Sequence, residues 1–134
     1  MLAKQYKLTW KDINFLFKKQ KVVYWKYFCF FHFQQYSNRH FNQFAIQVPV
    51  KLTKKATTRN IVKRSFFEYI RKNSMFKDTF WWYYYKIFVV FNKKYVSSLK
   101  NSIETMEKKL INSEIVNNFE FSFNNFRKQK WKNL

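Results

Sequence analysis

Glycine is absent from this chain of 134 residues, and proline and cysteine occur once each. Without glycine the chain has no glycine-rich loop to cradle phosphate groups, and any turn that requires a positive φ must use another residue type. Asparagine tolerates that conformation well, so the Asn pairs at 117–118 and 124–125 are the candidates. Because Cys29 is the one cysteine, an internal disulfide framework is excluded.

Acidic residues are also scarce, since seven acids stand against 27 basic residues and none lies between Asp12 and Glu68. The acids are scattered, and no Ser/His/Asp or Cys/His arrangement typical of nucleophilic catalysis accompanies them. No Cys/His spacing resembles a zinc site, and the isolated His32 and His40 fit structural or surface roles. We therefore expect no catalytic residue, no metal and no cofactor, and we predict that the chain is not an enzyme.

Long hydrophobic runs are missing as well. The longest aromatic and aliphatic run, residues 80–91, is interrupted by Lys86 and is shorter than the ~20 apolar residues that a membrane helix needs. The N-terminus lacks the charged, apolar and small-residue order of a secretory signal. These features predict neither a membrane nor a small-molecule substrate as a partner.

The abundant residues are cationic and aromatic. The net charge is +20, 47% of residues are hydrophobic and 24% are aromatic. Self-repulsion of this size opposes compaction unless a polyanion neutralises it, while the apolar content indicates a buried core and argues against disorder. Phe, Tyr, Lys and Asn have AT-rich codons, and their abundance indicates an AT-rich organellar genome.

The hydrophobic pattern predicts an α+β fold in one domain. A period of two or a β-branched and aromatic run indicates strands, and steps of three and four indicate helices. The predicted strands are 21–27, 46–52, 80–91 and 119–123, and the predicted helices are 28–44 and 96–110, with a short helix from Asp12.

This β-α-β-β-α-β order is that of a ferredoxin-like sandwich, in which two helices cover one face of four antiparallel strands. A long basic loop is then expected between strands two and three. Residues 1–20 are assigned to an N-terminal extension, 21–123 to the domain and 124–134 to a basic C-terminal tail.

The expected loop concentrates positive charge, because residues 51–72 hold eight basic residues against Glu68 alone. A solvated face is the plain interpretation of such a run. However, arginine forks suit phosphate oxygens, and interleaved Thr and Asn can contact phosphate or sugar. The neighbouring Phe66, Phe67 and Tyr69 could stack on bases. The predicted RNA-binding residues are Lys51, Lys54, Lys55, Arg59, Lys63, Arg64, Arg71 and Lys72, followed in the tail by Arg127, Lys128, Lys130 and Lys132.

Three short segments resemble the tenth protein of the ribosomal small subunit in its mitochondrial form. Residues 49–52 (PVKL) resemble the start of that family's RNA-contacting loop, 59–65 (RNIVKRS) its Arg-Phe-Thr-Val-Leu-Arg-Ser, and 85–89 (YKIFV) its third strand. The resemblance implies a structural protein of the head of a mitochondrial small subunit, located in the mitochondrion and bound to small-subunit ribosomal RNA and to neighbouring ribosomal proteins.

Three alternatives to this interpretation stay open. The first is an accessory subunit of a mitochondrial inner-membrane respiratory complex, since organellar genomes also encode such aromatic-rich chains. The second is a different mitochondrial ribosomal protein with a similar charge balance. The third is a free-standing single-strand RNA binder that uses aromatic stacking.

Overall fold

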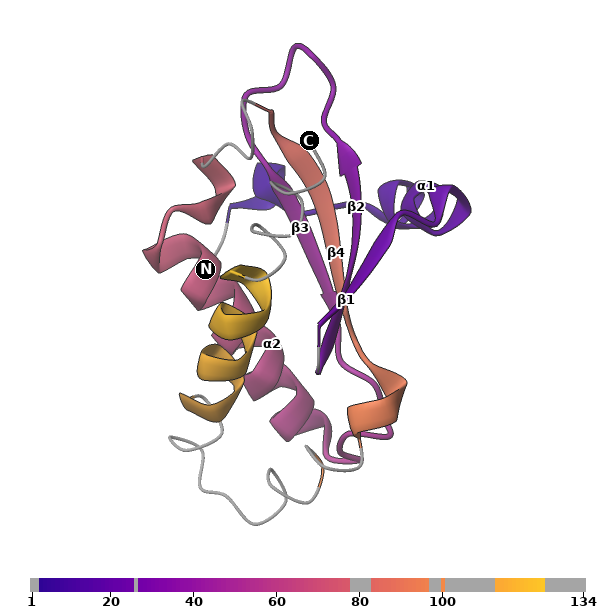
Figure 1. Ribbon diagram of the computed structural model, residues 1–134. Helices are drawn as coiled ribbons and strands as arrows, with labels where there is room; N and C mark the ends of the chain where they lie inside the picture. Colours follow the sequence, from indigo (N-terminus) through magenta and orange to yellow (C-terminus); the bar gives the residue numbers. More distant parts are fainter. Residues whose placement is uncertain (1–2, 26, 78–82, 97–99, 101–112, 125–134) are drawn as a thin grey trace.

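The computed structural model describes residues 3–25, 27–77, 83–96, 100 and 113–124. After a short 3-10 turn, η1, and the helix α1, three strands follow one another before α2, and β4 comes after α2 (Figure 1). The elements are η1 (Lys4–Tyr6), α1 (Trp10–Lys19), β1 (Val22–Trp25), β2 (Phe28–Gln34), β3 (Gln43–Gln47), α2 (Ala56–Lys72), η2 (Met75–Lys77), β4 (Tyr85–Phe91) and η3 (Lys93–Tyr95). A further helix covers residues 113–124.

The described strands form one four-stranded sheet in the order β1-β2-β4-β3. β1 and β2 form an antiparallel hairpin, and β2 pairs antiparallel with β4, so that Phe28 faces Phe91 and Gln34 faces Tyr85. β3 pairs with β4 in parallel, with Phe44 opposite Ile87. Parallel neighbours need a crossover connection, and α2 lies in that connection.

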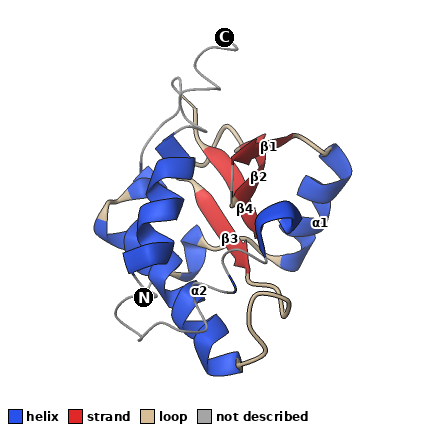
Figure 2. Cartoon of the chain, turned by 60° about the horizontal axis from the view of Figure 1, so that its bottom comes forward, coloured by secondary structure: helices blue, strands red, loops and turns tan. Residues whose placement is uncertain are grey.

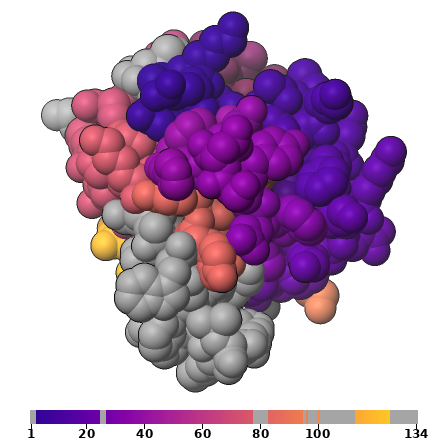
Figure 3. Space-filling view, turned by 90° about the horizontal axis from the view of Figure 1, so that it is seen from above, coloured from indigo at the N-terminus to yellow at the C-terminus, as the bar shows by residue number. Residues whose placement is uncertain are grey.

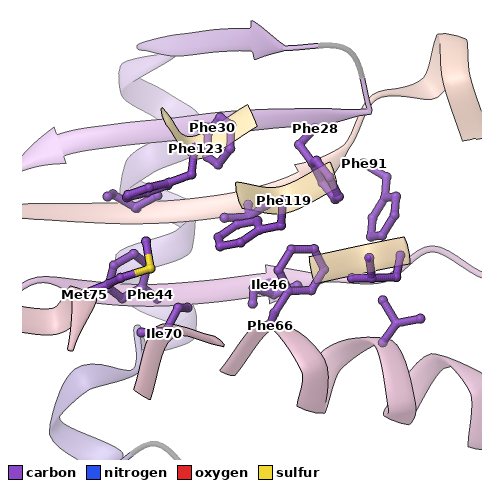
Figure 4. Packing of buried hydrophobic residues seen from close by; sticks show 14 of the residues in the cluster. Phe28, Phe30, Phe44, Ile46, Phe66, Ile70, Met75, Phe91, Phe119 and Phe123 are labelled. Carbon is purple, nitrogen blue, oxygen red and sulfur yellow. The ribbon is translucent and has the colours of Figure 1, made fainter. Parts of the chain in front are cut away.

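One face of the sheet carries the main core. β4 sends alternate side chains to it, and α2 and the helix 113–124 cover it (Figures 1 and 2). Aromatic rings dominate the packing, as Figure 4 shows: the Phe66 and Phe119 rings meet edge to face with centroids 4.6 Å apart, and Phe28 meets Phe66 at 5.3 Å. Edge-to-face pairs of this kind stabilise by about 0.5–1.5 kcal/mol beyond their burial.

The opposite face is covered by α1 (Figure 2). Thr9 caps this helix: its hydroxyl accepts from the Asp12 N–H, and the Asp12 carboxylate accepts from the Thr9 N–H. Asp12 also accepts a 2.7 Å hydrogen bond from Lys86, which is 2% exposed on β4. Burial alone would raise the pKa of Asp12, but the hydrogen bonds from Lys86 and Thr9 outweigh it and lower the pKa.

Glutamine and serine take the positive-φ positions for which the sequence suggested asparagine. Among the described residues, Gln20 and Ser74 adopt a positive φ, each at 51°. Gln20 ends α1 in the left-handed conformation, and its N–H donates to the Leu16 carbonyl. The asparagine pair at 117–118 lies inside a helix instead, so the expectation that asparagine fills these turns is wrong for that pair. A left-handed L-residue costs about 1–2 kcal/mol, which neighbouring structure must offset.

The α+β class predicted from the sequence is confirmed, as is a four-stranded sheet. The strands predicted at 21–27 and 80–91 correspond to β1 and β4, and the helix expected from Asp12 corresponds to α1. The strand predicted at 46–52 overlaps β3 only at Ile46 and Gln47, because β3 starts earlier and ends before Pro49, which cannot donate a ladder hydrogen bond. The expectation of purely antiparallel strands is wrong, because β3 and β4 run parallel.

Two segments have the opposite structure from the one predicted. The predicted helix at 28–44 is wrong, because 28–34 form β2, an inner strand that is apolar toward both layers. The predicted strand at 119–123 is wrong, because Phe119 and Phe123 lie on one face of a helix while Phe121 is 59% exposed. The helix predicted at 96–110 falls almost entirely outside the described residues. No helix among the described residues is long and apolar enough to cross a membrane.

Candidate nucleic-acid interface

The predicted basic loop is a helix. α2 occupies Ala56–Lys72, so the expectation of a long loop between strands two and three is wrong. Val62, Phe66 and Ile70 step by four residues and are fully buried against the sheet, which is the stripe that an amphipathic helix buries. The charged residues between them point away from the core, and the basic segment therefore has a fixed backbone.

The outward face of α2 is cationic. Lys63 and Arg64 are exposed in the middle of the helix, one turn beyond the exposed Asn60. Neither Lys63 nor Arg64 forms an ion pair with any part of the chain that the structure describes. Side chains at this spacing lie on adjacent turns of one surface, so α2 offers two cations and an amide to a partner from a rigid support.

The turn before α2 extends this surface. Lys51, Lys54 and Lys55 are exposed there. Arg59 has a different role from the one predicted, because its Nη1 donates a 2.9 Å hydrogen bond to the carbonyl of buried Thr53 and so ties the turn to the helix. The Thr53 hydroxyl in turn accepts from the Lys55 N–H at 3.3 Å.

The last turn of α2 is partly neutralised. Arg71 donates from Nη2 to Glu68 at 2.8 Å and from Nε at 3.4 Å. The pKa of Glu68 is lowered to about 2, and the hydrogen bond from Arg71 is the largest cause, so this carboxylate is charged at neutral pH. Arg71 therefore contributes less free charge than Arg64, whereas the neighbouring Lys72 is exposed.

Lys7 joins the same surface although the sequence gives no sign of it. The N-terminal segment lies beside β3, because the Leu8 N–H donates to the Phe44 carbonyl at 2.9 Å. The Lys7 ammonium then lies 5.1 Å from the ring centroid of Phe67, one turn beyond Lys63 and Arg64 on α2. Only the fold brings these residues together.

The four remaining predicted site residues belong to the C-terminal tail. The tail residues Arg127, Lys128, Lys130 and Lys132 fall outside the described part of the chain. Within the residues that the structure describes, no group of three His, Cys, Asp or Glu side chains could hold a metal ion. Apart from the paired Arg71, we call the exposed cations of α2 and of the turn before it, together with Lys7 beside Phe67, the α2 surface: Lys7, Lys51, Lys54, Lys55, Lys63, Arg64 and Lys72.

Together, the layered fold and the α2 surface define a small, strongly basic α+β protein with a cationic helix on its outside. The sequence model of the Ribonuclease P family matches residues 2–119. The chain therefore belongs to the Ribonuclease P family, because this match covers most of its length.

Solved structures agree with this assignment at the level of the fold. The RNase P protein from Staphylococcus aureus is similar with a TM-score of 0.65 and 19% identity, over 89% of this chain and 93% of that one. The RNase P protein from Thermotoga maritima is similar with a TM-score of 0.57 and 24% identity, over 83% and 92% of the two chains. A comparison with curated protein sequences gives no match.

These findings correct the interpretation drawn from the sequence. The resemblance to the tenth small-subunit ribosomal protein is wrong, and so are ribosomal RNA and ribosomal proteins as partners. The segment RNIVKRS at 59–65, which was matched to a loop, lies within α2. The respiratory-complex and other ribosomal alternatives are not supported either. The prediction that the chain is not an enzyme is also wrong, because the family is part of an RNA-processing enzyme.

Proposed function

We propose that the chain is the protein component of a ribonuclease P, in which it works with an RNA component in tRNA processing. The family match over residues 2–119 is the observation that carries this proposal. The α2 surface supports it, because the exposed cations stand on a helix that the core holds in place.

The chain's part in this enzyme is to bind and position RNA. A net charge of +20 opposes close packing of the protein on its own, and RNA phosphates remove that penalty. Each phosphate that a lysine or arginine neutralises releases counterions, which favours binding and makes the affinity depend on salt. Because α2 is already ordered, binding through it does not require the backbone to fold first.

Position on the helix and pairing with other groups of the chain divide the proposed RNA contacts. Lys63 and Arg64 are the strongest candidates for phosphate contact, and Lys51, Lys54, Lys55 and Lys72 extend the footprint. Arg59 acts by holding the preceding turn, and Arg71 binds RNA only in competition with Glu68. Contacts from Arg127, Lys128, Lys130 and Lys132 stay a prediction from the sequence.

Reconstitution tests the proposal. The full-length chain is combined with the ribonuclease P RNA of Staphylococcus aureus and a precursor tRNA, and cleavage is followed over a range of salt concentrations. We expect the chain to raise the cleavage rate, and we expect Lys63→Ala/Arg64→Ala to raise it less. If the chain neither changes cleavage nor binds this RNA more tightly than an unrelated RNA of equal length, the proposal is wrong.

The location and domain boundaries stay predictions from the sequence. We propose a mitochondrial location because the abundance of residues with AT-rich codons indicates an organellar genome, and fractionation of cells with an antibody to the chain would test it. Among the residues first assigned to an extension, Ile13 and Leu16 of α1 are buried against the sheet, so deletion of residues 1–20 is expected to destabilise the domain.

A further inference from the structure

The loop between β2 and β3, residues 35–42, lies at the end of the molecule away from the start of α2 (Figure 1). Figure 3 shows that end, with the loop in purple beside the indigo N-terminal segment and the pink residues that follow α2. In this loop Tyr36 is 56% exposed. A large ring so exposed at the tip of a loop is a candidate for a binding function.

Two cations hold the Tyr36 ring. The Lys86 ammonium lies 4.1 Å from the ring centroid, and the Arg39 guanidinium carbon lies 5.0 Å from it. Lys86 is itself fixed by the 2.7 Å bond to Asp12. Cations at these distances attract an aromatic ring electrostatically, so Tyr36 is restrained even though much of its surface faces solvent.

Buried amides also hold the loop backbone. Gln35 donates from Nε2 to Gln43 Oε1 at 3.0 Å and to the Phe41 carbonyl at 3.3 Å. Asn42 is fully buried, donates to the Met75 carbonyl at 2.8 Å, and accepts from the Tyr85 N–H at 2.7 Å. A loop fixed in this way loses little conformational entropy when it binds a ligand.

The charge of the loop suits an anion. No acidic residue lies between Asp12 and Glu68, and Asp12 is already paired with Lys86. The Arg39 guanidinium makes one hydrogen bond to the described chain, from Nη1 to Gln43 Oε1 at 3.2 Å. Arginine has five N–H donors, so Arg39 keeps donors for a phosphate oxygen beside the exposed ring.

We propose that Tyr36 and Arg39 form a second RNA-binding site, which takes an unpaired base together with its phosphate. The base stacks on the Tyr36–Arg39 pair, because bases stack on aromatic rings and on guanidinium planes alike. Arg39 contacts the adjoining phosphate. The site rests on the proposed function, since RNA is taken as the partner, but it uses residues separate from the α2 surface.

Binding of two labelled RNAs by the full-length chain tests this site. One probe is a fluorescein-labelled oligoadenylate of about ten nucleotides, which is within the range that a single-strand site covers. The other is an RNA duplex of similar length, which offers phosphates but no free base. Tyr36→Leu should weaken oligoadenylate binding about tenfold, as expected for loss of one stacked base, and should leave duplex binding unchanged.

Matched variants make the result decisive. Tyr36→Phe keeps the ring and should bind oligoadenylate like the parent chain. Tyr24→Leu removes a tyrosine that is 64% exposed on β1 and should also bind oligoadenylate like the parent chain. Arg39→Gln keeps the Tyr36 ring and should weaken oligoadenylate binding, so it decides the matter if Tyr36→Leu does not fold. Unchanged oligoadenylate affinity, or equal loss by Tyr24→Leu or on the duplex, would overturn the proposal.

Lys63→Ala/Arg64→Ala in the same assay separates the two proposals. Loss on both probes by this double variant, with normal binding by Tyr36→Leu and Arg39→Gln, overturns the loop site alone. Loss only by the loop variants overturns the α2 surface and supports the loop site.

Discussion

Replacing Lys63 and Arg64 by alanine removes two exposed cations from the middle of α2 without touching the buried stripe of Val62, Phe66 and Ile70. If each contacts one phosphate, the slope of log affinity against log salt should become shallower by about 1.8, taking the contribution of about 0.9 per contact that holds for a B-form duplex. Between about 50 and 200 mM salt, the variant should therefore lose roughly tenfold less affinity than the parent chain.

Fluorescence anisotropy of the labelled RNA duplex over that salt series measures the slope. The control is Lys11→Ala/Lys18→Ala, which changes the net charge equally but removes exposed lysines from α1, on the opposite side of the sheet. We expect the control to keep the parent slope. Equal flattening by both double variants would show that net charge alone governs binding, and the reasoning about the α2 surface would be refuted.

Three further predictions concern stability and reactivity. Asp12→Asn should lower the free energy of unfolding at neutral pH by about 3 kcal/mol, because Lys86 stays buried without a charged partner. Because the pKa of Asp12 is lowered in the fold, the parent chain should lose this stabilisation only as pH falls below about 4. A urea titration at pH 7 that finds the variant as stable as the parent chain would contradict this prediction. Phe119→Ala should cost about 3–5 kcal/mol by removing the ring that meets Phe66 at 4.6 Å, and a loss under 1 kcal/mol in the same titration would count against the packing described. Burial raises the pKa of the Cys29 thiol to about 11, so iodoacetamide should label it slowly in the folded chain and fast in denaturant. Equal labelling rates in the folded and denatured chain would contradict this prediction.

The sequence predicted well those elements whose period had one interpretation. β1 and β4 are runs of β-branched and aromatic residues, and β4 lies inside the sheet as expected. Aromatic residues at almost every position made other periods ambiguous. In β2, Phe28 and Phe30 face the main core while Phe31 and Phe33 face α1, so a helical spacing could be picked from a strand that is apolar on both faces.

The same ambiguity hid the helices. Phe119, Phe121 and Phe123 alternate with polar residues as a strand would, yet Phe119 and Phe123 are buried one helical turn apart. In α2 the many cations between the buried residues obscure the steps of four residues that indicate a helix. The segment predicted as a basic loop is therefore the helix α2, with its charge on the outer face.

The candidate site was predictable in its residues and not in its geometry. The exposed lysines and Arg64 could be predicted from the dense positive charge and the Thr, Asn and aromatic residues around it, but the pairing of Arg71 with Glu68 and the structural bond of Arg59 depend on helix geometry. Lys7 reaches Phe67 only because the N-terminal segment runs along β3. Contacts between residues so distant in the sequence leave no local pattern.

Identification of the RNA that the chain binds in its own cell tests the central claim most directly. The tagged full-length chain would be crosslinked to RNA by ultraviolet light, purified under denaturing conditions and sequenced through the attached RNA, with Lys63→Ala/Arg64→Ala as the matched comparison. We predict that a ribonuclease P RNA and precursor tRNAs dominate the reads and that both fall in the double variant. Reads dominated by small-subunit ribosomal RNA, or unchanged by the double variant, would contradict the account.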